Sequence, residues 1–92
     1  MKVVWTIPAK VDLDQAVDFA VVRDELLAAT LLDEAAKATD FLADFPHAGA
    51  PLDEAGLRKL RLGKLPNILI YRLLDDRLEI LRVQHSSMDW RS

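Results

Sequence analysis

The residues that could carry chemistry in this chain gather near its end. The sequence closes with VQHSSMDWRS, which places His85 beside two serines and close to Asp89. Ser, His and Asp form hydrolytic triads, but neighbours on an extended chain point to opposite sides, and a triad also needs an oxyanion site. We interpret this ending as a surface for recognition, in which Met88 and Trp90 either dock onto the domain or contact a partner. The candidate target-binding residues are His85, Met88, Asp89, Trp90 and Arg91.

Length and composition limit the framework that can position these residues. Ninety-two residues predict a single domain, residues 1–92, with a modest core. The chain has no cysteine, which excludes disulfides and thiolate metal sites and favours a reducing cytoplasm. The first ten residues are too short for a signal peptide, and no apolar run approaches the roughly 20 residues of a membrane span. We therefore expect a cytoplasmic protein that does not enter the membrane.

The first half of the chain predicts a strand followed by two helices. Residues 3–7 are β-branched and aromatic, which is typical of a strand. Asp12 is placed to cap a helix over 12–22, and Asp24 is placed to cap a second helix over 25–44. The short break between the helices predicts an antiparallel hairpin. Five side chains are expected to pack this hairpin on a sheet: Val17, Val21, Leu31, Ala35 and Leu42.

The second half predicts three antiparallel strands, at 57–62, 67–74 and 77–85. A tight turn at Asp75-Asp76 would pair the last two strands, with Arg72 facing Glu79 across them. The fold class is therefore α+β: an N-terminal strand, a two-helix antiparallel hairpin and a three-stranded antiparallel sheet.

Both faces of this predicted sheet are apolar. In that register one face carries Ile68, Ile70, Leu81 and Val83, and the opposite face also carries large apolar side chains. A small helical hairpin covers only one face, so the other needs a cover from a loop or from another chain.

Charge is divided unevenly along the chain, which has a net charge of −3. Residues 1–56 hold 4 Lys/Arg and 11 Asp/Glu, whereas residues 57–92 hold 8 and 4. Either this reflects solvated helix faces and strand edges, or the second half offers a basic surface to an acidic partner.

Four short sequence motifs, in this order along the chain, resemble those of one protein family. They are FPHAG, GLRKLRL, ILIYRLLDDRLEILRVQH and HSSMDW. Together they resemble the ParE branch of the RelE/ParE toxin superfamily. This resemblance implies the toxin of a bacterial type II toxin–antitoxin pair, and a ParD-like antitoxin whose C-terminal segment would cover the apolar sheet face. The candidate partner-binding residues are Leu57, Arg58, Leu60, Arg61, Leu62, Arg72 and Arg82.

The same resemblance leaves three activities open. ParE-like members inhibit DNA gyrase without being enzymes, RelE-like members cleave messenger RNA on the ribosome, and a degenerate member would keep only antitoxin binding. A nuclease needs a general acid, a general base and cations on the phosphate, for which the candidates are Arg58, Arg61, Arg82 and His85. Because the net charge is negative, we favour gyrase inhibition, with no sequence-specific nucleic-acid binding by the toxin alone. We expect no cofactor and no metal site, since no ligand spacing recurs.

Overall fold

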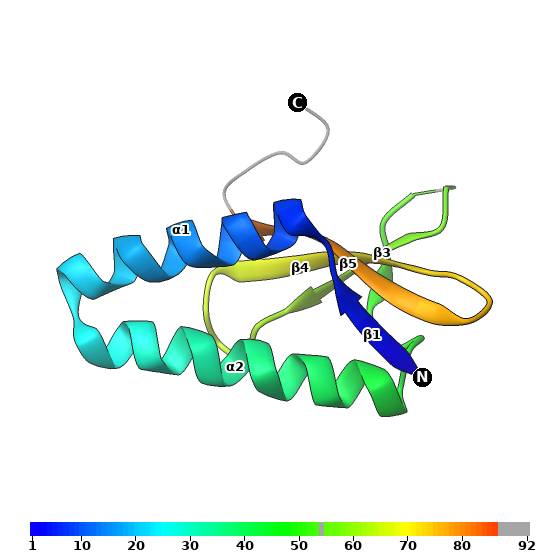
Figure 1. Ribbon diagram of the computed structural model, residues 1–92, viewed down its shortest axis with the longest axis horizontal. Helices are drawn as coiled ribbons and strands as arrows, with labels where there is room; N and C mark the ends of the chain where they lie inside the picture. Colours follow the sequence, from blue (N-terminus) through cyan, green and yellow to red (C-terminus); the bar gives the residue numbers. More distant parts are fainter. Residues whose placement is uncertain (54, 87–92) are drawn as a thin grey trace.

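The computed structural model contains a helical hairpin packed on one face of a five-stranded sheet (Figure 1). It describes residues 1–53 and 55–86. In chain order the elements are β1 (Lys2–Trp5), α1 (Ile7–Arg23), α2 (Glu25–Asp44), β2 (Ala50–Pro51), β3 (Leu57–Arg61), β4 (Asn67–Leu73) and β5 (Arg77–His85). The α+β prediction is therefore confirmed, with the short strand β2 as an addition.

The strand order of the sheet is β1-β5-β4-β3-β2. The predicted strands β3, β4 and β5 pair antiparallel, and β1 adds to β5 in parallel. Arg72 faces Glu79 as the sequence indicates. Residues that pair directly across strands point to the same side of a sheet. The register therefore sorts each side chain to the helix-covered face or to the open face.

Helix α1 begins five residues earlier than the sequence predicts. Its N-cap is Thr6, whose hydroxyl accepts a hydrogen bond from the Ala9 N–H and donates one to the Ile80 carbonyl at 2.8 Å. Pro8 lies in the first helical turn, where a missing N–H costs no helical hydrogen bond. Residues 3–7 are therefore not all strand, and Asp12 is an interior helix residue rather than a cap.

Helix α2 has the predicted bounds. The Asp24 side chain accepts from the Leu26 N–H at 2.9 Å and caps the helix. Leu31, Ala35 and Leu42 are buried as expected, and Val17 is half-buried against them. Val21 was expected in this interface but is 48% exposed, because it falls on the outer side of α1 near the hairpin tip.

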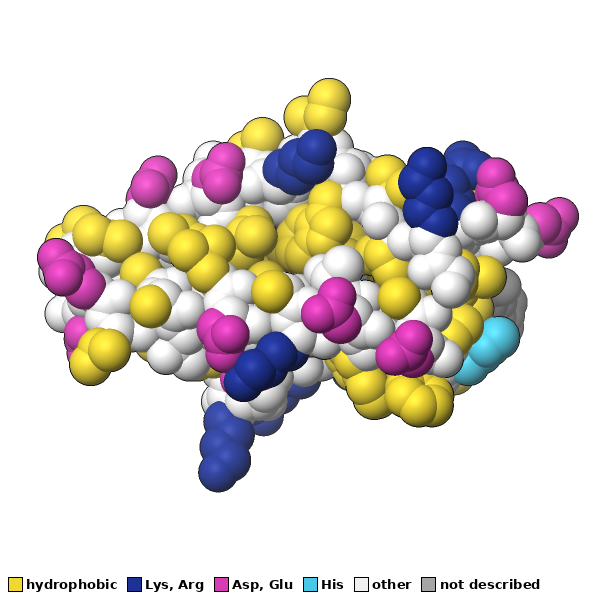
Figure 2. Space-filling view, turned by 60° about the horizontal axis from the view of Figure 1, so that its bottom comes forward, with side chains coloured by type: hydrophobic (Ala, Val, Ile, Leu, Met, Phe, Trp, Pro, Cys, Tyr) yellow, Lys and Arg dark blue, Asp and Glu magenta, His cyan; other side chains and the backbone are white. Residues whose placement is uncertain are grey.

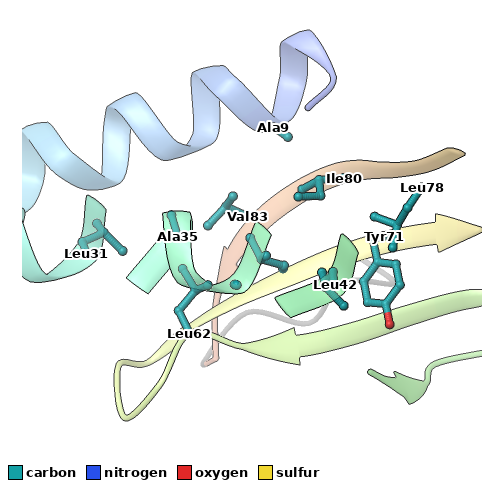
Figure 3. Packing of buried hydrophobic residues seen from close by; sticks show 11 residues of the cluster. Ala9, Leu31, Ala35, Leu42, Leu62, Tyr71, Leu78, Ile80 and Val83 are labelled. Carbon is teal, nitrogen blue, oxygen red and sulfur yellow. The ribbon is translucent and has the colours of Figure 1, made fainter. Parts of the chain in front are cut away.

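The core lies between the helical hairpin and the sheet (Figure 3). Figure 3 shows Leu31 and Ala35 from α2 and Val83 from β5 pointing into this space. Tyr71, Leu78 and Ile80 extend the same cluster toward the other end of the sheet, and all three are fully buried.

An irregularity between Ile70 and Tyr71 changes the predicted sheet faces. The predicted register holds from Tyr71 to Leu73, but beyond the irregularity it shifts by one residue, so Leu69 faces Val83. Val83 therefore joins the helix-covered core instead of the open face. Ile70 stays on the open face, and its side chain is only 5% exposed.

The exposed apolar surface lies on the helical layer rather than on the sheet. Among the described residues, the large exposed hydrophobic side chains belong to the helices, to Phe45 directly after α2 and to Met1 before β1, and none belongs to the strands. The expectation of an uncovered apolar sheet face is therefore wrong. No helix in residues 1–53 or 55–86 is long and apolar enough to cross a membrane.

Candidate partner-binding site

Strand β3 and the turn after it carry a strip of four cations. We call Arg58, Lys59, Arg61 and Lys64 the β3 strip. Within the described part of the chain, no carboxylate lies within ion-pair distance of any of them. The other arginines of the sheet each pair with a carboxylate, as Arg72 does with Glu79 at 2.8 Å. The β3 strip is thus a concentration of uncompensated positive charge on an acidic protein. It covers both sides of β3, because Arg58 pairs with Tyr71 on the helix-covered side, whereas Lys59 and Arg61 pair with Ile70 and Ile68 on the open side.

Two members of the strip are held by backbone carbonyls. Arg58 Nη1 donates to the carbonyls of His47 and Gly49 at 3.2 and 2.8 Å. Arg61 Nε donates to the Leu65 carbonyl at 2.7 Å. A carbonyl fixes a guanidinium without cancelling its charge, and other N–H groups of each fork remain for a partner. This arrangement reduces the side-chain entropy lost when an anion binds.

The loop beside the strip is fixed by Tyr71, the only tyrosine in the chain. The Tyr71 hydroxyl donates to the Pro46 carbonyl at 2.9 Å and accepts from the Gly49 N–H at 2.8 Å. Burial raises the pKa of Tyr71 above its ordinary value, so the hydroxyl stays protonated as the first bond requires. Gly49 has no room for a side chain, since a Cβ there would lie 2.5 Å from the Tyr71 oxygen.

An apolar groove runs beside the strip, between α2 and β3. Phe41 is shared by two adjoining hollows, one of about 410 Å³ toward Leu60 and one of about 590 Å³ toward Phe45. The rings of Phe41 and Phe45 lie 5.3 Å apart between centroids and are 45% and 58% exposed. We call this surface the α2–β3 groove. Hydrophobic side chains also form a band along the helical layer, with acidic side chains on both sides of it (Figure 2).

Three of the predicted partner-binding residues are already engaged in the free chain. Arg72 pairs with Glu79 and lowers the pKa of that carboxylate, with their hydrogen bond as the largest cause. Arg82 Nε donates to Asp12 Oδ2 at 2.7 Å. Leu62 is fully buried in the core, so it offers no surface to a partner and that expectation is corrected. Leu60 and Arg61 line the groove, and Arg58 lies beside it through its hydrogen bonds to His47 and Gly49. Leu57 pairs with Arg72 on the open side of the sheet, away from the groove.

The four nuclease candidates do not converge on one point. The register places Arg58 and His85 on the helix-covered side, and Arg61 and Arg82 on the open side. Arg58 on β3 lies opposite Tyr71, and His85 on β5 lies opposite Asn67, so the two are about 13 Å apart along the strand direction and two strand spacings apart across the sheet. A single phosphate cannot contact all four side chains in this conformation.

His85 ends β5, as the sequence predicts, and lines a different hollow under the hairpin tip. Ser86 follows, and its N–H donates to the Pro66 carbonyl. The other candidate target-binding residues, Met88, Asp89, Trp90 and Arg91, lie outside the described residues. In the described part of the chain no group of three or more His, Cys, Asp or Glu side chains could hold a metal ion.

Comparison with known proteins assigns the family. The family model described as "ParE toxin of type II toxin-antitoxin system, parDE" matches residues 3–90. The chain belongs to the ParE toxin family. It is 34% identical over 86 residues to a Sinorhizobium fredii protein named "Putative toxin Y4kP", covering 94% of this chain and 88% of that protein.

A solved structure agrees with this ParE assignment. The structure described as "Chromosomal ParDE TA system from P. aeruginosa" superposes with a TM-score of 0.80 at 27% identity. The match covers 92% of this chain and 95% of that one. The resemblance drawn from the sequence is thus confirmed at the level of the family and the fold.

Several residues of the groove were not among the predicted site residues. Phe41 and Phe45 were not singled out, although their four-residue spacing puts both on one face at the end of α2. Lys59 and Lys64 were omitted in favour of nearby arginines. The excess of cations over residues 57–64 was the available signal for both lysines.

Proposed function

We propose that this ParE-family chain is a toxin that binds and inhibits DNA gyrase and that a ParD-like antitoxin neutralises it. The observation that carries the proposal is the separation of the four nuclease candidates, two of which are bonded to backbone carbonyls and one to Asp12. Such an arrangement favours action by binding over RNA cleavage. The RelE-like and non-toxic alternatives are outcomes of the experiment below.

The proposed antitoxin site is the α2–β3 groove with the β3 strip. An apolar floor made by Phe41, Leu60 and Phe45 fits the hydrophobic side of a bound segment. The unpaired cations of the strip, which lie on both sides of β3, fit carboxylates that flank the apolar residues of that segment. We therefore expect the toxin-covering segment of the antitoxin to combine large apolar residues with several Asp or Glu.

The test is induction of the chain in bacterial cells, alone and together with a candidate ParD-like antitoxin. Gyrase inhibition predicts growth arrest with altered plasmid supercoiling and intact messenger RNA, relieved by the co-expressed antitoxin. Cleaved messenger RNA with normal supercoiling would establish the nuclease alternative instead. Normal growth with retained antitoxin binding would identify a non-toxic member of the family.

A further inference from the structure

A second hollow lies under the tip of the helical hairpin, at the end of the sheet where β4 begins and β5 ends. Its volume is about 290 Å³. Phe19, Leu27, Leu65 and Val83 supply apolar walls from α1, α2, the β3–β4 turn and β5. We call it the tip cleft. It shares no lining residue with the α2–β3 groove, so both surfaces can be occupied at once.

The polar residues of the tip cleft are few. Arg23, Asn67 and His85 line it together with the apolar walls. The Arg23 guanidinium stacks on the Phe19 ring, 3.8 Å from its centroid. In the part of the chain that the structure describes, no carboxylate lies within ion-pair distance of Arg23. An apolar pocket with a few polar groups and one uncompensated cation suits a ligand that is apolar at one end and anionic at the other.

The size of the cleft limits the occupant. A volume of about 290 Å³ is just below the range of small-molecule pockets, which is about 300 to 1,000 Å³. It suits a single large side chain better than a metabolite or cofactor. Buried aromatic side chains with a charged neighbour are common anchors of protein interfaces.

We propose that the tip cleft holds one large apolar side chain and an adjacent carboxylate of the toxin's target protein. This inference rests on the proposed function, because the target is the protein that the toxin inhibits. The cleft fits the target better than the antitoxin because it is separate from the α2–β3 groove. His85, the described member of the predicted target-binding residues, is also part of its wall.

The first test measures the ligand chemistry without any target. The full chain, labelled with ¹⁵N, is titrated with N-acetyl-L-tryptophan and with N-acetyl-L-tryptophanamide, which lacks the carboxylate. We expect amide shifts confined to residues around the cleft and about 5-fold tighter binding of the acid. In Arg23→Gln the two probes should bind within about 2-fold of each other. Equal binding of both probes by the unaltered chain, or no binding at millimolar concentrations, would overturn the proposal.

The second test links the cleft to toxicity. Leu27→Asp puts a carboxylate into the apolar wall, whereas Leu26→Asp makes the same change one residue away, outside the cleft, at a side chain that is 75% exposed. We expect Leu27→Asp to lose growth arrest and to keep its antitoxin binding and circular dichroism spectrum, and Leu26→Asp to arrest growth like the unaltered chain. Full growth arrest by Leu27→Asp would refute the target role of the cleft.

The two tests separate this inference from the proposed function. If the unaltered chain fails to arrest growth, the proposed function fails and the assignment of the cleft to a target fails with it. An Arg23-dependent preference for N-acetyl-L-tryptophan would even then establish the cleft as a site for apolar acids.

Discussion

Asp12 on α1 binds Arg82 on β5, although 70 residues separate them in the chain. Its Oδ2 accepts from Arg82 Nε at 2.7 Å and from the Val83 N–H at 3.0 Å. Strand β1 pairs with β5 only as far as Ile80. Beyond that point Asp12 accepts the hydrogen bond of the Val83 N–H, which has no partner strand at this edge of β5. Arg82, a nuclease candidate from the sequence, is thus placed as a structural residue.

Replacing Asp12 with alanine should destabilise the fold. The change removes a charge-assisted hydrogen bond and leaves a partly buried N–H without its acceptor, so we expect the free energy of unfolding to fall by about 2–3 kcal/mol. Urea unfolding followed by circular dichroism measures this. Asp14→Ala is the control, because it removes the same charge from a neighbouring exposed position. An equal effect of the two substitutions would contradict the structural role of Asp12.

The two helices show how far sequence reasoning reaches in this chain. Asp24 and Pro46 are local signals, so the bounds of α2 were predicted correctly. Thr6 was missed as a cap because Asp12 offered a stronger local signal. Its decisive partner, the Ile80 carbonyl, is 74 residues away.

The site was less predictable than the fold for a similar reason. The shift between Ile70 and Tyr71 leaves no sequence signature, yet it decides which face Val83 occupies. The composition of the sequence shows correctly that the second half of the chain is basic. It did not reveal which arginines are neutralised, because Arg82 pairs with a helix residue far along the chain.

The free energy of unfolding should decrease at high pH because of the Tyr71 hydroxyl. Its pKa is raised by burial, so the folded chain keeps a proton that the unfolded chain loses near pH 10. This stabilisation is fully present below about pH 10 and decreases as the pH rises toward the folded pKa. Since Tyr71 is the only tyrosine, absorbance at 295 nm titrates it directly. A midpoint at the ordinary tyrosine value would contradict the buried hydroxyl.

Tyr71→Phe is the matched variant for this pH dependence. It should lower the free energy of unfolding at pH 7 by about 1–3 kcal/mol, because the buried Gly49 N–H loses its acceptor. Above about pH 10 its stability should decline less steeply than that of the unaltered chain, since no phenol remains to ionise. Parallel slopes for the two proteins would show that other groups cause the decline.

Charge reversal on the β3 strip should slow antitoxin binding. Lys59 and Lys64 are exposed and form no ion pair with a described residue, so Lys59→Glu/Lys64→Glu should leave the fold intact. We expect the association rate to fall about 10-fold or more at low salt, with a smaller change in the dissociation rate. Surface plasmon resonance at several salt concentrations measures both rates. Lys2→Glu/Lys10→Glu makes the same charge change elsewhere on the chain. An equal decrease of the association rate in that variant would show that the strip is not part of the antitoxin interface.

His85→Ala should reduce growth arrest only modestly, by less than about 10-fold. A general acid or base contributes about 100- to 10,000-fold to a rate, so a nuclease that depended on His85 would lose nearly all activity. Titrating the inducer in a growth assay, with the amount of each variant measured by immunoblot, gives this ratio. A complete loss of toxicity at equal abundance, with antitoxin binding intact, would favour catalysis.

The most direct test of the account is a gyrase supercoiling assay with the purified chain, run beside a ribosome-bound messenger RNA cleavage assay with the same preparation. We expect dose-dependent inhibition of supercoiling, reversed by antitoxin, and an intact messenger RNA. Cleaved messenger RNA together with unaffected supercoiling would contradict the claim that this chain acts by binding gyrase.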